Sequence, residues 1–301
     1  MNSELKDLLT SQQYRVVGNH AAVKICHWTK ESLRNKGFCY KQQFYGVDSH
    51  RCLQMTPCAD VCNQRCVYCW RPMEGSLNSF PTAEIDEPDE MIDRLIEQQR
   101  ALIMGFKGHS EIDMKKFEEA LEPKHAAISL SGEPTLYPKL GGLIESFHKR
   151  GLTTFLVTNG TRPDVLESIP EPTQLYISLD APNEEMYKKI DNPQISEGWK
   201  AIQKSLEMLK SFSCRTVIRL TLMRRNMVQA SDFGKLLDAV DPTCIEAKAY
   251  MHVGASQDRL PHSEMPLHSE IKAFSEELKN NTGFKILDEK PESRVVLLGK
   301  R

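Results

Sequence analysis

The sequence predicts an α/β fold, a partial (β/α)6 TIM-like barrel, and three observations lead to this prediction. From about residue 125 onward, short apolar runs alternate with amphipathic helical patterns. Prolines and a glycine stand where helices should begin and end. The 301 residues contain no Gly/Ser linker or low-complexity tract that would split the chain. With a first strand near residue 50, the pattern gives six βα units, two short of a closed eight-stranded barrel.

Each element of this barrel is predicted from its own pattern. The strand candidates are short and apolar, and they span residues 50–57, 125–132, 153–160, 174–181, 215–223 and 244–251. Helices are expected to begin at Pro88 and Pro138, and one is expected to end at Gly151. Two later helices show one apolar face each: Trp199, Ile202, Leu206 and Leu209 in the first, and Ile271, Phe274 and Leu278 in the second.

The domain organisation and the composition set broader limits. Residues 1–49 are predicted to form an N-terminal Cys-rich extension, and residues 50–301 the barrel with a C-terminal extension. The 39 basic and 41 acidic residues are not typical of a general nucleic-acid binder, although a local basic face is compatible with them. The N-terminal region lacks a signal peptide, and no stretch is long and apolar enough to span a membrane. A cytoplasmic protein is therefore expected.

Polar residues recur on one face of successive strands. Side chains alternate between the two faces of a strand, so four strands each bring polar residues to a single face: Ser129 and Ser131, Ser178 and Asp180, Arg219 and Thr221, and Glu246, Lys248 and Tyr250. Polar groups are costly to bury without partners, and barrel interiors are usually apolar. The alternation therefore predicts a polar lumen that holds a ligand.

Nine cysteines dominate the chemistry of the chain. Their odd number and the absence of a signal peptide argue against disulfides. Cys26, Cys39 and Cys52 stand thirteen residues apart, and a second trio follows at Cys62, Cys66 and Cys69 with C-x3-C-x2-C spacing.

Two readings of the cysteine trios are weighed. A structural zinc site usually has four protein ligands that complete its coordination. In contrast, three thiolates on an iron–sulfur cube leave one iron open to another ligand. Zinc in a non-catalytic RNA-binding protein remains the alternative of a different class.

The second trio resembles the cysteine signature of the radical S-adenosylmethionine (SAM) superfamily, with Tyr68 just before its last cysteine. The resemblance implies a 4Fe-4S cluster whose open iron binds SAM, and a partial barrel whose cysteine loop follows the first strand. Cleavage of SAM would give a 5′-deoxyadenosyl radical that abstracts hydrogen.

A second motif supports this resemblance. The run Ser131-Gly132-Glu133 before Pro134 ends the second predicted strand and is similar to the motif that holds the SAM amino group. Glycine lets backbone approach a ligand, and a carboxylate accepts hydrogen bonds from an ammonium. By the same logic four further residues are candidates for contacts to the SAM ribose or carboxylate: Asn159, Ser178, Asp180 and Arg219.

The pairing of both trios resembles the tRNA 4-demethylwyosine synthase family, in its single-domain form without a flavodoxin-like domain. The resemblance covers essentially the whole chain, including the segments at 39–46, 62–72 and 250–260. It implies a second 4Fe-4S cluster on Cys26, Cys39 and Cys52, and an external flavodoxin- or ferredoxin-like electron donor.

The resemblance also implies a reaction. N1-methylguanosine at position 37 of tRNA-Phe would lose a hydrogen from its methyl group and condense with two carbons of pyruvate, giving 4-demethylwyosine. Lys41, two residues after Cys39, is at the position that the family proposes for a Schiff base or an ionic contact with pyruvate. Phosphate contacts near the barrel mouth are predicted for four arginines: Arg71, Arg224, Arg225 and Arg259.

Cys58 fits neither trio and is interpreted as a bystander, because the frame that it would form with Cys62 and Cys66 lacks the superfamily spacing. Other two-cluster radical SAM enzymes are the nearest alternatives. Activating enzymes usually carry short C-x2-C spacings, and methylthiotransferases carry an appended RNA-binding domain that is not found after residue 260.

Overall fold

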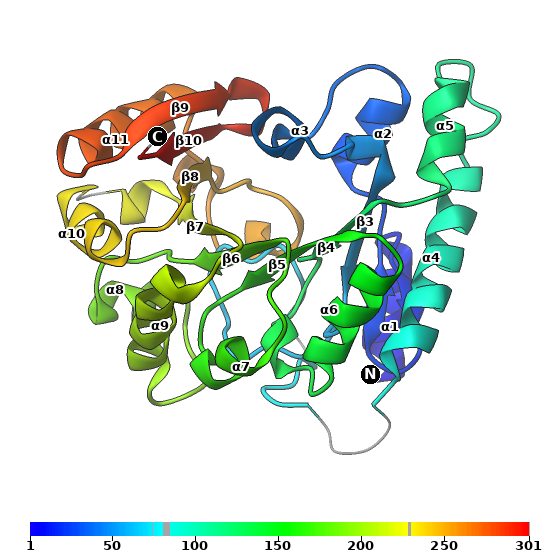
Figure 1. The fold of residues 1–301 in the computed structure, drawn as a ribbon, viewed down its shortest axis with the longest axis horizontal. Helices are drawn as coiled ribbons and strands as arrows, with labels where there is room; N and C mark the ends of the chain where they lie inside the picture. Colours follow the sequence, from blue (N-terminus) through cyan, green and yellow to red (C-terminus); the bar gives the residue numbers. More distant parts are fainter. Residues whose placement is uncertain (74, 81–84, 228–229, 301) are drawn as a thin grey trace. The chain divides into compact units, whose positions relative to one another are not determined.

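The computed structural model describes residues 1–73, 75–80, 85–227 and 230–300 (Figure 1). The chain divides into two compact units. The first comprises Met1–Cys62, Glu74–Val157 and Ser168–Thr173, and the second comprises Asn63–Met73, Thr158–Glu167 and Gln174–Arg301. The first 49 residues lie in one unit with β3–β5, and their separation from the barrel at residue 50 stays a prediction.

The sheet of the first unit joins antiparallel and parallel strands. The antiparallel strands β1 (Arg15–Val17) and β2 (Ala21–Val23) form a short hairpin that pairs with β3 (Cys52–Thr56). The parallel strands β3, β4 (His125–Ile128) and β5 (Thr153–Thr158) follow in chain order. Their register aligns Gln54 with Ala127 and Ala127 with Phe155, so these three side chains share one face of the sheet.

Helices cover the other face of this sheet. The helices of the unit are α1 (Ser3–Ser11), α2 (His27–Leu33), α3 (Tyr40–Tyr45), α4 (Pro88–Met104), α5 (Met114–Ala120) and α6 (Leu140–Lys149). The apolar strand residues Leu53, Met55 and Ile128 are fully buried, and they alternate with the Gln54 face. Helix α4 packs against α6 and against β3. The apolar face toward the helices is therefore present, whereas the opposite face of these strands carries Gln54 together with the apolar Ala127 and Phe155.

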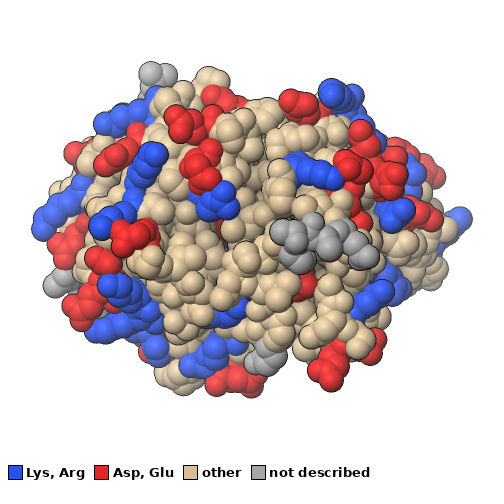
Figure 2. Space-filling view, turned by 90° about the horizontal axis from the view of Figure 1, so that it is seen from below, with Lys and Arg blue, Asp and Glu red and all other residues tan. Residues whose placement is uncertain are grey.

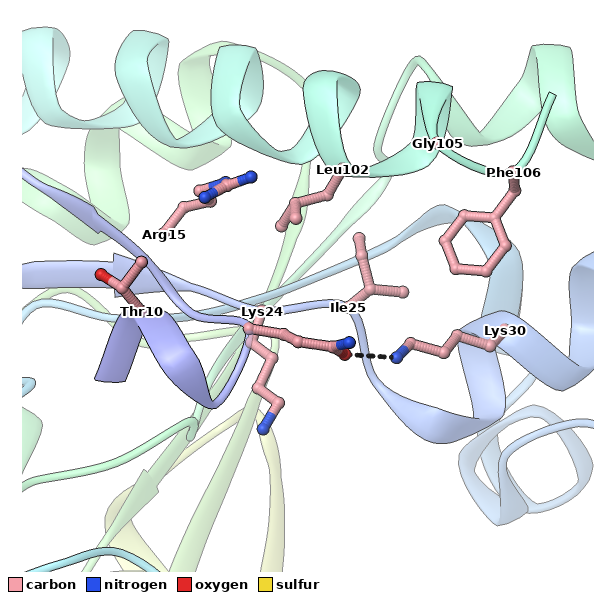
Figure 3. Close-up of a pocket in the computed structure, with 9 residues that line it drawn as sticks. Thr10, Arg15, Lys24, Ile25, Lys30, Leu102, Gly105 and Phe106 are labelled. Atoms are coloured by element: carbon pink, nitrogen blue, oxygen red, sulfur yellow. Dashed lines mark hydrogen bonds between the residues drawn. The ribbon is translucent and has the colours of Figure 1, made fainter. Parts of the chain in front are cut away.

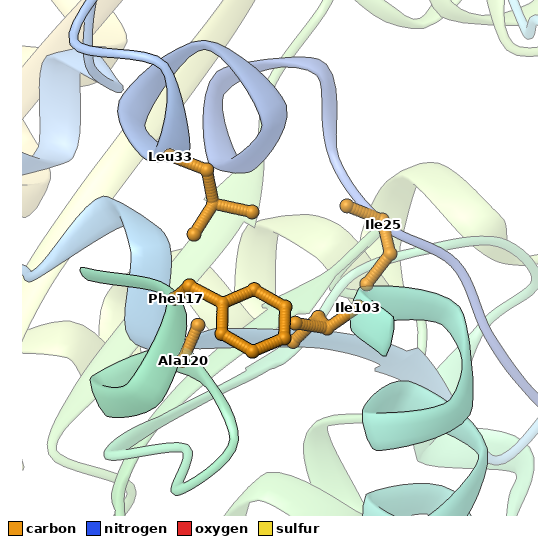
Figure 4. Close-up of a cluster of buried hydrophobic side chains, with 5 residues drawn as sticks. All are labelled: Ile25, Leu33, Ile103, Phe117 and Ala120. Atoms are coloured by element: carbon orange, nitrogen blue, oxygen red, sulfur yellow. The ribbon is translucent and has the colours of Figure 1, made fainter. Parts of the chain in front are cut away.

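A small apolar core supports the segment that carries the first cysteines. Ile25 precedes α2 and Leu33 ends it, and both pack against Ile103, Phe117 and Ala120 of α4 and α5 (Figure 4). Since Ile25 directly precedes Cys26, burial of this apolar surface holds the backbone of the cysteine in place.

The second unit continues the strand–helix pattern. Parallel strands β6 (Gln174–Ser178), β7 (Arg215–Leu222) and β8 (Cys244–Ala249) pair in chain order. Strand β10 (Val295–Gly299) pairs antiparallel with β8 and with β9 (Lys285–Lys290). The helices are α7 (Pro163–Ser168), α8 (Glu184–Ile190), α9 (Gly198–Glu207), α10 (Ala230–Val240) and α11 (His268–Asn280). Helix α11 packs on α10, β8, β9 and β10.

Short 3-10 turns complete the connections. They are η1 (Ser49–Arg51), η2 (Pro134–Leu136), η3 (Met208–Ser211), η4 (Arg224–Asn226), η5 (Gly254–Asp258), η6 (His262–Glu264) and η7 (Pro291–Ser293). Among the described residues, no helix is long and apolar enough to cross a membrane.

Most of the predicted elements are confirmed. A parallel strand lies within each of the six predicted ranges, and α4 begins at Pro88. The predicted helix after Pro138 begins two residues later, at Leu140, and ends before Gly151, whose φ is +74°. The apolar faces predicted on α9 and α11 are buried. The antiparallel strands β1, β2, β9 and β10 were not predicted.

Candidate functional site

The first cysteine trio lies within the first unit, on three different elements. Cys26 and Cys39 are the N-cap residues of α2 and α3, and both have extended backbone dihedrals and no side-chain capping hydrogen bond. Cys52 begins β3. All three are half-buried. The partial positive charge at the start of each helix suits an anionic group held by the capping sulfurs.

The thiol of Cys52 lies close to the rest of the trio. Burial raises the pKa of Cys52 to about 12, and the charges of Cys26 and Cys39 add to the increase. The ammonium of Lys41 acts in the opposite direction. A bound metal would deprotonate its thiol ligands and compensate their charge.

Lys41 is buried beside this trio. It lies in the first turn of α3, and its Nζ is 5.0 Å from the centroid of the Phe155 ring. Because Phe155 shares a sheet face with Gln54, and Gln54 with Cys52, the lysine amine approaches the same polar face as the trio. Within the described residues, the only other buried lysine is Lys290.

The second trio begins in the first unit and continues in the second. Cys62 is buried, and its backbone N–H donates to the carbonyl of Leu77 at 2.9 Å. Cys66 and Cys69 belong to the second unit, where Cys69 N–H donates to the carbonyl of Cys66 at 3.0 Å.

Backbone contacts in the second unit position the loop around Cys66 and Cys69. The N–H of Val67 donates to the last carbonyl of α8, that of Ile190, at 2.8 Å. The guanidinium of Arg259 donates to the carbonyls of Val67 and Cys69. The loop is therefore held on both sides of its middle residue, Tyr68.

Tyr68 leads from this loop to two buried carboxyl groups. Its hydroxyl donates to Asp180, whose other oxygen accepts from the N–H of Thr221 at 2.6 Å. Burial raises the pKa of Asp180 to about 6, and burial raises the pKa of Asp191 well above its usual value, with the charge of Asp180 as the second cause. Burial likewise raises the pKa of Tyr68.

The Ser131-Gly132-Glu133 turn is packed tightly in the first unit. Gly132 has φ +69°, and a Cβ on it would lie 1.7 Å from the carbonyl oxygen of Cys58. Glycine is therefore required at this position. Cys58 itself is fully buried, and its interpretation as a bystander stays a prediction.

Two neighbouring side chains of the turn differ in their hydrogen bonding. The Oγ atom of Ser131 is buried and finds no hydrogen-bond partner among the described residues. Glu133 is buried and its Oε1 accepts from the N–H and the hydroxyl of Thr135, at 3.0 and 2.6 Å. Glu133 thus caps η2, while Ser131 offers a buried hydroxyl to a ligand.

The remaining candidates for SAM contacts lie in the second unit. Asn159 donates to the side-chain oxygen of Asn63 at 2.8 Å, in the segment that leads into the Cys66 loop. Ser178 is half-buried and, with Asp180, lines a small cavity. Arg219 is held by Glu246 at 2.8 Å and lies over the ring of Tyr176. This ion pair satisfies part of the polar face that the alternation predicted.

The four arginines predicted to contact RNA have different surroundings. Arg71 is only 3% exposed, so the prediction that it lies on a solvent-facing rim is wrong. Arg224 and Arg225 are exposed and paired with Glu270 and Glu264 at 2.7 and 2.9 Å. Arg259 binds the loop carbonyls described above. Figure 2 shows basic and acidic side chains interspersed on the face that it views.

The residues present fit the groups that the sequence implies. Three half-buried thiols within one unit, two of them at helix N-termini, suit a thiolate-ligated cluster. A glycine whose Cβ position is filled by backbone, and a buried hydroxyl without a partner, suit a turn that approaches a ligand closely. No three Cys, His, Asp or Glu side chains of the described residues are placed to hold a single metal ion.

Sequence reasoning missed Asp191 and the loop-binding role of Arg259. Asp191 follows α8 and is buried, with hydrogen bonds to Cys66 and Tyr68. In the sequence it resembles an ordinary helix-terminating polar residue, and no local signal indicates its burial. Arg259 stands 190 residues after Cys69, so only the folded chain connects them.

Comparisons with known families agree with this geometry. The model described as the Radical SAM superfamily matches residues 56–237, and the model described as wyosine base formation matches residues 239–300.

Individual relatives extend the match over the whole chain. An S-adenosyl-L-methionine-dependent tRNA 4-demethylwyosine synthase of Pyrococcus abyssi is 49% identical over 99% of this chain and 89% of its own. The protein of the same description from Methanocaldococcus jannaschii is 43% identical over 98% and 95%. A solved structure of TYW1 with a lysine-pyruvate adduct bound is 42% identical, with a TM-score of 0.91, and the match covers 100% of this chain and 96% of that one. The fold prediction, a partial TIM-like barrel of the radical SAM superfamily, is thereby confirmed.

Proposed function

Because this chain belongs to the family of radical SAM tRNA 4-demethylwyosine synthases, we propose that it condenses N1-methylguanosine-37 of tRNA-Phe with two carbons of pyruvate. It is a SAM-dependent enzyme with a 4Fe-4S cluster, and its substrate is a tRNA. The observation that carries the finer proposal is the burial of Lys41 beside a trio of cysteines, in a chain related to one whose structure holds a lysine-pyruvate adduct.

The cysteines divide between two proposed clusters. Cys62, Cys66 and Cys69 have the superfamily spacing and follow β3, so they would hold the cluster that binds SAM. A second cluster is proposed on the first trio, Cys26, Cys39 and Cys52. When bound, SAM and the cluster on Cys62, Cys66 and Cys69 would supply the chemistry that abstracts hydrogen from the methyl group of the base.

The chain itself would hold pyruvate. The Nζ of Lys41 would either condense with the C2 carbonyl of pyruvate, with loss of water, or bind the carboxylate as an ion pair. Either route requires a lysine held beside the first trio, as Lys41 is. Lys290 is a weaker candidate because its Nζ lies 3.7 Å from Glu292, in the other unit.

The SAM contacts are proposed on the basis of position in the fold. Ser131 and Gly132 would present a hydroxyl and an unobstructed backbone to the ligand, and Glu133 would hold the turn while its carboxylate faces the ammonium. Asn159, Ser178, Asp180 and Arg219 remain candidates for the ribose and the carboxylate. Asn159, Asp180 and Arg219 are hydrogen-bonded or paired within the protein, and Ser178 lines a small cavity. Binding of SAM would therefore require some of these protein contacts to be replaced by contacts to the ligand.

The remaining partners follow from the reaction. Reduction of the SAM-binding cluster requires electrons, for which an external flavodoxin- or ferredoxin-like protein is proposed. Arg224 and Arg225 are proposed to contact phosphates of the tRNA by exchanging their carboxylate partners. A tRNA substrate and nine free cysteines support a reducing compartment, the cytoplasm expected from the sequence.

One experiment tests the whole proposal. The anaerobically purified protein should be brown and contain roughly eight iron atoms per chain, as two cubane clusters require. Incubation with SAM, a reductant, pyruvate and tRNA-Phe carrying N1-methylguanosine should yield 4-demethylwyosine by nucleoside mass analysis. A colourless protein that binds two zinc ions and yields no product would support the non-catalytic alternative.

A further inference from the structure

A cavity of about 320 Å³ lies in the first unit, apart from both cysteine trios (Figure 3). Its walls come from α1, β1, α2 and the C-terminal end of α4. Arg15 and Lys30 approach it from opposite sides, and Lys24 lies at its edge with its amine over the ring of Tyr14. The described residues that line this cavity include three basic side chains and no acidic one.

Arg15 and Lys30 differ from several other cations of the unit, which are paired with carboxylates. Lys36 is paired with Glu111 and Arg100 with Glu122, each at 2.6 Å. In contrast, the Arg15 side chain has no hydrogen bond or ion pair with any described residue. Lys30 donates only to the neutral amide of Gln13, at 3.1 Å. Among the described residues, no carboxylate therefore pairs with Arg15 or Lys30.

One wall of the cavity is apolar. Ile25 is buried, and the side chains of Leu102 and Phe106 are half-buried at the end of α4 (Figure 3). A ligand in this cavity would meet cationic donors from β1 and α2 and an apolar surface from Leu102 and Phe106. A volume of this size is at the lower end of the range of small-molecule sites, about 300–1,000 Å³.

We propose that this cavity binds a nucleotide, with its phosphate on Arg15 and Lys30 and its base or sugar against Leu102 and Phe106. Guanidinium groups bind phosphate oxygens through two parallel hydrogen bonds, and aromatic rings stack on bases. The amide of Gln13 and the hydroxyl of Thr10 add neutral polar groups at the same rim. A concave site favours a small or local phosphate group over the flat face of an acidic protein.

Two sources would supply this chemistry: a free mononucleotide or a nucleotide of the tRNA substrate. The second source rests on the proposed function, because it makes the cavity an anchoring point for RNA at a distance from the reacting base. The two sources are separated by their probes, namely adenosine monophosphate for the first and a tRNA-Phe transcript for the second.

The test compares two double variants of the full chain. Arg15→Gln/Lys30→Gln removes two charges from the cavity. Lys36→Gln/Arg100→Gln removes two charges from carboxylate-paired positions in the same unit and serves as the matched control. Iron content and circular dichroism establish that both variants fold like the wild type.

The expected result depends on the source. If the nucleotide belongs to RNA, the cavity variant binds the tRNA transcript about tenfold more weakly, and the slope of log K against log salt falls by about 1.5. If the nucleotide is free, calorimetry detects adenosine monophosphate on the wild type and the control but not on the cavity variant, with tRNA affinity unchanged.

The proposal is overturned if the cavity variant matches the control with both probes, or if adenosine binds as well as adenosine monophosphate. These binding measurements need no turnover. Failure of the wild type to form 4-demethylwyosine would therefore count against the proposed function alone.

Discussion

Lys41 allows a sharp test at the scale of a single residue. Lys41→Ala should abolish incorporation of pyruvate while SAM is still cleaved, because the lysine belongs to the first trio and not to the loop of Cys66. Lys290→Ala, at the other buried lysine, should keep wild-type product formation. Borohydride treatment with pyruvate should add mass to the wild type and not to Lys41→Ala if an imine forms. Full product formation by Lys41→Ala would disprove the assignment.

Gly132 tests the tight turn next to the cysteine loop. Gly132→Ala should lower the free energy of unfolding by about 3 kcal/mol or more, since it adds a clash with the carbonyl of Cys58 to the strain of a left-handed residue. Gly151→Ala is the matched control, because Gly151 has a similar φ of +74° and nothing within 4 Å of its Cβ position. Urea unfolding should show a loss of only about 1–2 kcal/mol there. Equal losses of unfolding free energy in the two variants would mean that the clash with the Cys58 carbonyl does not contribute at Gly132.

Asp180 predicts a pH effect with a defined sign. Its folded-state pKa of about 6 exceeds the unfolded value of 3.8, so the folded state binds the proton more tightly and stability falls as pH rises from about 4 to about 6. Asp180→Asn removes this penalty. Anaerobic urea unfolding should therefore show the variant gaining about 2 kcal/mol on the wild type between pH 4.5 and pH 7.5. A difference that is constant across this range would contradict the raised pKa.

Residue types and spacings allowed much of the site to be predicted, and tertiary contacts explain the rest. The cysteine trios and Lys41 stand out because their spacing is local and their chemistry is restrictive. Arg71 could not be placed correctly, because nothing in its neighbours along the chain signals that it is buried. Arg219 was expected to be available to a ligand, but Glu246 on the adjacent strand holds it, and strand register is not visible in composition.

The same contrast appears at the scale of the elements. The six parallel strands were predicted because each is a buried apolar run followed by a helical pattern. Strands β1 and β2 have three residues each, too few for a periodic signal. Strand β9 mixes charged and apolar residues, and its pairing depends on β10 rather than on its own sequence. Long-range pairing therefore determined what the sequence could not predict.

The loop of Cys66 and Cys69 depends on one distant side chain. Arg259→Ala should reduce the iron content from roughly eight atoms toward four, because the carbonyls of Val67 and Cys69 lose their common donor. Arg259→Lys should restore little, since an ammonium lacks the planar pair of donors. Electron paramagnetic resonance of the reduced protein should show the loss of only the SAM-responsive signal.

Arg225→Ala, in which a surface ion pair with Glu264 is removed, is the matched control for this loop and should retain all of its iron. Retention of iron by Arg259→Ala would mean that the contacts of Val67 and Ile190 suffice to hold the loop.

At the scale of the whole molecule, the two trios should behave as separable sites. A Cys26→Ala/Cys39→Ala/Cys52→Ala variant should keep roughly four iron atoms and reductive cleavage of SAM but form no 4-demethylwyosine. A Cys62→Ala/Cys66→Ala/Cys69→Ala variant should also keep roughly four iron atoms and lose SAM cleavage. Substitution of Cys58 should leave both clusters and the product intact. Loss of all iron from either triple variant would indicate a single shared site.

Strand β3 has a consequence for how this chain can change over time. Cys52 begins the strand, and the loop that carries Cys62 follows its end. Four steps along the strand, from Cys52 to Thr56, set a span of about 13 Å. Deleting or inserting one residue there would alter that span by about 3.3 Å and turn the first sulfur toward the helices. The strand thus sets the distance between the two cysteine segments, and it should tolerate substitutions far better than insertions or deletions.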